Sequence, residues 1–86
     1  LRVAQLAEPP GVMLAPHTVP ELHAHLVMAF PRCGFAVESH GNAQRDPVSH
    51  GLYREHTQTR DSYVYLNDKP GFGVEIDWEF VKRHRA

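Results

Sequence analysis

Two ionisable side chains stand directly after short apolar runs in the first half of the chain. His17 follows residues 12–15 by way of a proline, and Glu38 follows residues 34–37. An imidazole has an ordinary pKa of about 6.5, so it can take up and return a proton at neutral pH. A positioned acid–base group of this kind contributes about 10²- to 10⁴-fold to a rate. We predict proton transfer for His17, although these residues alone leave open a locally bonded loop histidine and a solvated Glu38.

Seven histidines among 86 residues invite a metal-site hypothesis. His23 and His25 are two apart in a predicted helix, where they point to different faces and cannot chelate one ion together. We expect both to be structural, with His25 beside the apolar flank and His23 facing outward. The remaining histidines lack the Cys/His pairing of a zinc finger. They are His17, His40, His50, His56 and His84. A small His-rich metal-binding module is therefore the weakest alternative for this chain.

Helices and short strands must hold the two candidate residues. Residues 1–8 place apolar side chains at helical spacing before a Pro-Pro-Gly stop, which predicts the end of a helix. Residues 12–15 and 34–37 are apolar runs of strand length. Residues 21–30 between them predict an amphipathic helix, with Thr18 as its N-cap. The order helix, strand, helix, strand is typical of βαβ units with a parallel sheet.

The second half of the chain has a different pattern. An Asp-Pro pair at residues 46–47 marks a turn. Residues 58–66 predict a hairpin that pivots around residues 60–62. Asp77 is the expected N-cap of a last short helix that begins at Trp78.

Composition excludes several classes of partner. Nine Lys and Arg against ten Asp and Glu give a formal charge of −1, so there is no basic field to attract nucleic acid. No run approaches the roughly 20 apolar residues that a membrane span needs, so no membrane partner is expected. Cys33 is the single cysteine and the N-terminus lacks a signal-peptide pattern, which favours a cytoplasmic location.

Two separated motifs carry a resemblance to a known family. Residues 15–26 read APHTVPELHAHL, a strand end in His followed by a helix with an E-x-x-A-H-L pattern. Residues 68–76 read DKPGFGVEI, a D-x-P-G-x-G stretch, and residues 34–38 lie between the two. In this order they resemble the seventh strand, eighth strand and C-terminal stretch of mandelate racemase/muconate lactonizing enzyme-like proteins of the enolase superfamily. The resemblance covers nearly all of the chain.

The resemblance implies an α/β fold that is one piece of a larger enzyme. The chain would be a C-terminal fragment of a (β/α) TIM-type barrel, about strands 7 and 8, plus a C-terminal extension with a small β-hairpin. Residues 1–42 would form the barrel part, and residues 43–86 the extension that packs on the barrel and a capping domain. The family holds Mg²⁺ with carboxylates on earlier strands, so we expect Mg²⁺ in the parent enzyme and none bound by this segment.

The resemblance also implies roles for the two candidate residues. His17 would be the proton-transfer residue. Glu38, kept protonated by its surroundings, would donate a hydrogen bond to the enediolate oxygen. The family spacing counted from His17 reaches Val37, so a one-residue insertion is assumed, and adjacent strand positions face opposite sides.

The implied reaction is removal of the proton next to a carboxylate in a hydroxy acid or acid sugar. We expect an acid-sugar dehydratase, with a racemase or epimerase as the close variant, and an 86-residue chain that is inactive alone. The alternative is a non-catalytic remnant that acts through self-association or a partner chain, because uncovered strand edges pair readily. The expected partners are a small hydroxy acid and the rest of the barrel or another copy of the chain, in a homo-oligomer.

Overall fold

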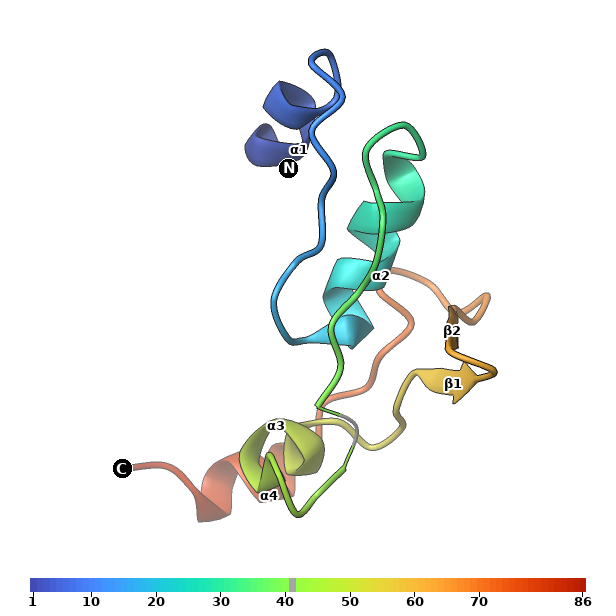
Figure 1. The fold of residues 1–86 in the computed structure, drawn as a ribbon. Helices are drawn as coiled ribbons and strands as arrows, with labels where there is room; N and C mark the ends of the chain where they lie inside the picture. Colours follow the sequence, from blue (N-terminus) through green and yellow to red (C-terminus); the bar gives the residue numbers. More distant parts are fainter. Residues whose placement is uncertain (41) are drawn as a thin grey trace.

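The computed structural model describes residues 1–40 and 42–86 and has an α/β composition (Figure 1). Its elements, in chain order, are α1 (Arg2–Ala7), α2 (Pro20–Ala29), α3 (Pro47–Leu52), β1 (Gln58–Arg60), β2 (Tyr63–Tyr65) and α4 (Trp78–Arg83). Gly41, which the sequence places in the polar loop after the second apolar run, lies outside the described residues. None of the described helices is long and apolar enough to cross a bilayer.

Helices α1 and α2 confirm the two helices predicted in the first half. Helix α2 begins with Pro20, whose fixed φ suits the first helical position. The expected N-cap was wrong, because Val19 occupies the cap position and no side chain caps the helix. Thr18 lies one residue further out, where its carbonyl oxygen accepts a hydrogen bond from the ring of His23 at 2.8 Å.

The two apolar runs lie side by side as extended segments along α2 (Figure 1). They meet in a parallel bridge between Leu14 and Gly34. Leu14 N–H donates to the Cys33 carbonyl at 2.7 Å, and Phe35 N–H donates to the Leu14 carbonyl at 2.9 Å. The parallel orientation agrees with the sequence, but the pairing is one isolated bridge rather than two regular strands. Parallel strands normally have neighbours and are covered on both faces, and this pair consists of two segments only.

The hairpin predicted over residues 58–66 is confirmed. Strands β1 and β2 pair antiparallel with Gln58 opposite Tyr65 and Arg60 opposite Tyr63. Asp61 and Ser62 connect them with φ angles of 51° and 64°. Two positive φ angles in a two-residue loop are the geometry of a type I′ turn, whose twist matches that of the strands.

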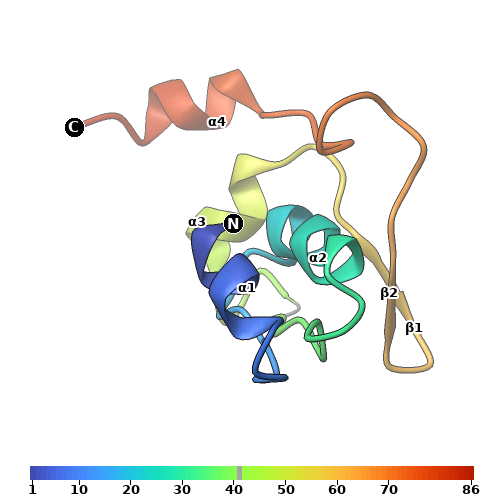
Figure 2. The same ribbon diagram turned by 90° about the horizontal axis from the view of Figure 1, so that it is seen from above.

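Helices α3 and α4 contact each other at the end of the molecule away from α1 (Figure 1), and the view from above shows α4 at the edge, on the outer side of α3 (Figure 2). The sequence reading placed only a turn where α3 begins, although Asp46 caps this helix by accepting from Ser49 N–H at 3.1 Å. The predicted cap of α4 is confirmed, because Asp77 accepts from Phe80 N–H at 2.9 Å. An antiparallel bridge between Tyr53 and Ile76 joins the segments that follow α3 and precede α4.

The buried core is small. The buried apolar residues among those described are Ala4, Ala7, Ala24, Cys33 and Tyr53. The radius of gyration is 14.3 Å, whereas a compact domain of this length has about 12 Å. Large apolar side chains remain exposed along the whole chain: Leu1, Val3, Leu6, Val12, Met13, Met28, Phe35, Val48, Tyr63, Tyr65, Phe72 and Trp78. The described part of the chain therefore presents much apolar surface to solvent.

The contact between α3 and α4 has a sharp steric test at Gly51. A Cβ atom at this position would overlap the ring of Phe80. Overpacking costs about 1–3 kcal/mol, which exceeds the gain of about 0.8–1 kcal/mol from placing Ala in a helix. We expect Gly51→Ala to lower the free energy of unfolding by about 1 kcal/mol in urea titrations. In a Phe80→Leu background the clash is absent and the same change should be neutral or stabilising. An equal loss in both backgrounds would contradict the packing described here.

Candidate functional site

The two residues singled out by the sequence touch each other. The parallel bridge between Leu14 and Gly34 sets the extended segments in register, and Glu38 N–H donates to the Pro16 carbonyl at 3.4 Å. Beyond that point the His17 ring places Nδ1 in contact with Glu38 Oε2. Both side chains are open to solvent, at 78% for His17 and 45% for Glu38. The pair is therefore accessible to a small molecule.

The carboxylate of Glu38 has three partners. Thr18 N–H donates to Oε2 at 3.2 Å, and His40 Nε2 lies 3.5 Å from Oε1. The Thr18 N–H lowers the pKa of Glu38 most, partial desolvation acts in the opposite direction, and His17 and His40 lower the pKa further. The carboxyl is therefore ionised at neutral pH. This differs from the expected protonated donor, because the group is exposed and surrounded by N–H donors rather than by apolar side chains.

The choice between Glu38 and Val37 depends on alternation along the second extended segment. Side chains in extended chain point to opposite sides in turn, so Glu38 and His40 share one side and Val37 faces the other. The contacts of Glu38 and His40 lie on the side of His17. In this structure Glu38 is the residue that faces His17.

An unusual backbone turn follows His17. Thr18 and Val19 have φ angles of 53° and 45°, in the left-handed region that β-branched residues rarely adopt. Such a conformation costs roughly 1–2 kcal/mol per residue and often marks a functional segment. The turn leads directly from the extended segment into α2 and aims the Thr18 N–H at Glu38. The strained residues therefore hold the carboxylate next to His17.

His40 is a member of the site for which the sequence left substrate contact and simple loop solvation equally open. Its ring packs edge-on against the ring of His17, with the centroids 5.8 Å apart. One ligand atom from each of His17, Glu38 and His40 lies within 4.8 Å of the others. We call these three residues the HEH cluster. The sequence signal for His40 is its i, i+2 spacing from Glu38, which places both side chains on one side of an extended segment. The sequence predicts a polar loop here instead.

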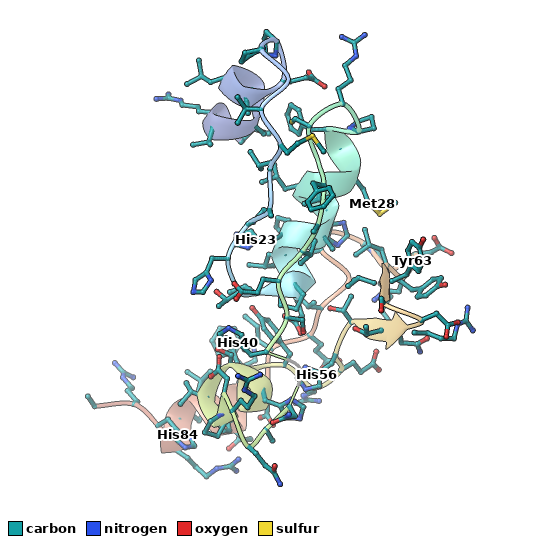
Figure 3. The ribbon with its side chains drawn as sticks, in the orientation of Figure 1. His23, Met28, His40, His56, Tyr63 and His84 are labelled. Carbon is teal, nitrogen blue, oxygen red and sulfur yellow. The ribbon has the colours of Figure 1, made fainter. Side chains whose placement is uncertain are left out.

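A cleft of about 160 Å³ lies beside the cluster, between the start of α2 and α3. His40 and His56, both on its wall, lie near α3 (Figure 3). Thr57 also lines the cleft. Its Oγ1 atom is buried and has no hydrogen-bond partner among the described residues. The rings of His50 and His56 stack with centroids 3.9 Å apart. The cleft therefore offers polar groups and imidazole faces to a ligand.

A buried acidic group supports the floor of the cleft. Glu21 is 9% exposed, and its Oε1 lies 3.4 Å from His56 Nδ1. Burial raises the pKa of Tyr53, and the nearby Glu21 carboxyl adds to this rise. Together these contacts connect the start of α2 to the segment that follows α3.

The sequence profile of the enolase C-terminal domain-like family matches residues 1–80 of this chain. The chain belongs to this family. A relative in Streptomyces bingchenggensis (strain BCW-1), described as a D-galactonate dehydratase family member, is 32% identical over 87 residues. That match covers 95% of this chain and 21% of the relative, so the chain spans about a fifth of that protein's length. No solved structure matches the chain.

Members of the enolase superfamily generally use Mg²⁺, so the donor atoms of this enolase-family chain decide whether it could hold that ion. Mg²⁺ prefers oxygen ligands in a near-octahedral arrangement. The HEH cluster supplies one carboxylate and two imidazoles, which do not form such a set. The HEH cluster therefore does not fit Mg²⁺.

The two histidines of α2 have structural contacts in this enolase-family chain. His25 Nε2 donates to the Phe72 carbonyl at 2.9 Å and joins α2 to the C-terminal stretch. His23 Nδ1 donates to the Thr18 carbonyl, as described above. His23 is half-buried rather than outward-facing, because the left-handed turn brings the Thr18 carbonyl over it.

Proposed function

We propose that this chain is the part of an acid-sugar dehydratase that carries one of its proton-transfer residues. The observation that carries the proposal is the contact of His17 Nδ1 with the ionised carboxylate of Glu38. A carboxylate on Nδ1 holds the proton there, which leaves Nε2 free to exchange a proton with a substrate. Family membership and a relative named for galactonate dehydration support the reaction class.

In the proposed reaction a hydroxy acid loses water. The carbon next to the carboxylate gives up its proton to a base that would lie outside these residues, the C–O bond of the β-hydroxyl breaks as water leaves, and the enol that remains becomes a 2-keto-3-deoxy acid. Hydroxide is a poor leaving group, so protonation of the departing oxygen lowers the barrier. His17 Nε2 would supply that proton, and Glu38 would position the ring and stabilise its charged form. Return of a proton to the same carbon, without loss of hydroxyl, would give the racemase or epimerase variant.

The cleft supports a polyhydroxylated substrate. Its wall includes residues with hydroxyl, amide and imidazole groups, among them Thr18, Ser39, Asn42 and His50. Polar groups of this kind fix the orientation of a ligand and discriminate between analogues that lack a hydroxyl. These polar groups support an acid sugar as the substrate class.

We also propose that residues 1–42 contribute about strands 7 and 8 of a barrel and that residues 43–86 pack on it as an extension. The parallel bridge of the two extended segments and the surface position of His17 support this arrangement, because barrel enzymes keep their chemistry at strand ends. The oxygen ligands for Mg²⁺ would come from a part of the polypeptide outside these residues.

The test is turnover of a panel of hexonates, including D-galactonate, by the complete polypeptide as its cell produces it, with Mg²⁺ present. We expect a keto acid product from at least one hexonate. Exchange of the α-hydrogen with D₂O without keto acid would favour the racemase or epimerase variant. Absence of both reactions across the panel would overturn the enzymatic proposal.

Exposed apolar side chains favour one other candidate, a chain that acts by association. Val3 and Leu6 of α1 and its N-cap residue Leu1 are each at least 69% exposed, and Phe35 is 70% exposed beside the parallel bridge. Contiguous exposed apolar patches often mark interaction sites, and these side chains are candidates for one. The occupant would be the rest of a barrel or another copy of this chain, and light scattering of the sample would distinguish them.

A further inference from the structure

We infer that the HEH cluster binds a borderline transition-metal ion such as Zn²⁺. His17, Glu38 and His40 offer two imidazole nitrogens and one carboxylate oxygen, each within 4.8 Å of the other two. Two histidines and one carboxylate are a ligand set that Zn²⁺ accepts, with a water molecule in the fourth position. The donor set that does not fit Mg²⁺ is therefore the one that suits zinc.

The spacing of the ligand atoms is close to that of a metal site. Tetrahedral ligands at about 2.0–2.1 Å from Zn²⁺ lie about 3.3 Å from one another. His40 Nε2 and Glu38 Oε1 are already 3.5 Å apart. Small rotations of the exposed His17 side chain bring its nitrogen to the same point, because nothing buried has to move.

The surroundings of the HEH cluster favour the binding of a cation. Metal-binding carboxylates are usually held by a second hydrogen bond, and the Thr18 N–H supplies one to Glu38. The exposure of His17 provides a path for the ion to enter.

This inference does not depend on the proposed dehydration. Metal binding is measured without substrate, and it can succeed whether or not any acid sugar is turned over. If both proposals hold, they compete for His17, since an imidazole bound to Zn²⁺ through either nitrogen is a poor proton carrier.

The experiment titrates Zn²⁺ into the complete polypeptide by calorimetry at neutral pH with excess Mg²⁺, and repeats it for His40→Ala. The matched control is His84→Ala, since His84 is the C-cap residue that follows α4 and is not a member of the cluster (Figure 3). We expect one Zn²⁺ per chain that is lost or weakened at least about tenfold in His40→Ala and retained in His84→Ala. Co²⁺ should give the visible bands of a low-coordinate site in the parent and in His84→Ala only.

Equal Zn²⁺ affinity in the parent and His40→Ala would overturn the inference, as would Co²⁺ spectra that match the aqueous ion. Circular dichroism without metal checks that each variant folds. If His40→Ala does not fold, His17→Asn replaces it, because the exposed His17 side chain supports no buried contact. The same weakening is expected for His17→Asn, and its absence would count equally against the site.

Discussion

His17→Ala is expected to lower kcat on an acid-sugar substrate by about 10²- to 10⁴-fold while the protein stays folded. The loss follows from removal of the group that would protonate the departing hydroxyl, whose catalytic contribution has this size. Folding should be unaffected, because the His17 side chain is 78% exposed and packs on no core residue. Steady-state rates of the complete polypeptide with the substrate found in the panel measure the effect.

Two controls separate proton transfer from a structural role of His17. His84→Ala removes a histidine of the same type at the end of α4 and should leave kcat unchanged. Added imidazole should restore part of the activity of His17→Ala, since a small base can occupy the space that the ring has left. If His17→Ala keeps most of its activity, His17 is not the proton donor.

Gly34→Ala is expected to have the largest effect on stability. A Cβ atom at this position would overlap the backbone carbonyls of Val27 and Phe30 at the end of α2. Backbone atoms cannot rotate away as a side chain can. The loss of unfolding free energy should therefore reach or exceed the value of about 1–3 kcal/mol that is typical of overpacking. Gly34 is also the bridge partner of Leu14, so its displacement moves Glu38 relative to His17. The free energy of unfolding measured in urea titrations and the kcat should therefore both fall.

Gly71→Asn is the matched control for this glycine. Gly71 has a φ of 69° and no atom near the position of an added Cβ, and Asn tolerates positive φ better than most residues. The unfolding free energy of the Gly71→Asn variant should differ from that of the parent by less than about 1 kcal/mol. A Gly34→Ala variant as stable as this control would show that α2 and the second extended segment are not in close contact.

Local patterns predicted the elements that depend on neighbours in sequence. The apolar spacing before the Pro-Pro-Gly stop gave α1, the stripe over residues 21–30 gave α2, and Asp77 marked the start of α4. Helix α3 was missed because its six residues include Gly51 and carry a single apolar pair, Val48 and Leu52, which is too short a pattern to predict a helix. The Asp-Pro pair before it was the available signal, since Asp favours the N-cap and Pro the first helical position.

Long-range register limited what the sequence could say about the site. His17 and Glu38 were identified from their positions after apolar runs, but their contact depends on the alignment of two segments 20 residues apart. A slip of one residue would turn Glu38 and His40 to the opposite side. The lowered pKa of Glu38 was not predictable, because its largest cause is the Thr18 N–H that the left-handed turn exposes.

The exposed apolar side chains affect how selection acts on this chain. A position such as Phe35 touches little within these residues, so its substitutions cost little if the chain works alone. If another surface covers it, the same substitutions create cavities and are removed from the population. Low natural variation at Phe35, Met13 and Leu6 would therefore indicate that this surface is covered in the cell, and high variation would indicate that it is open. This comparison needs no measured activity.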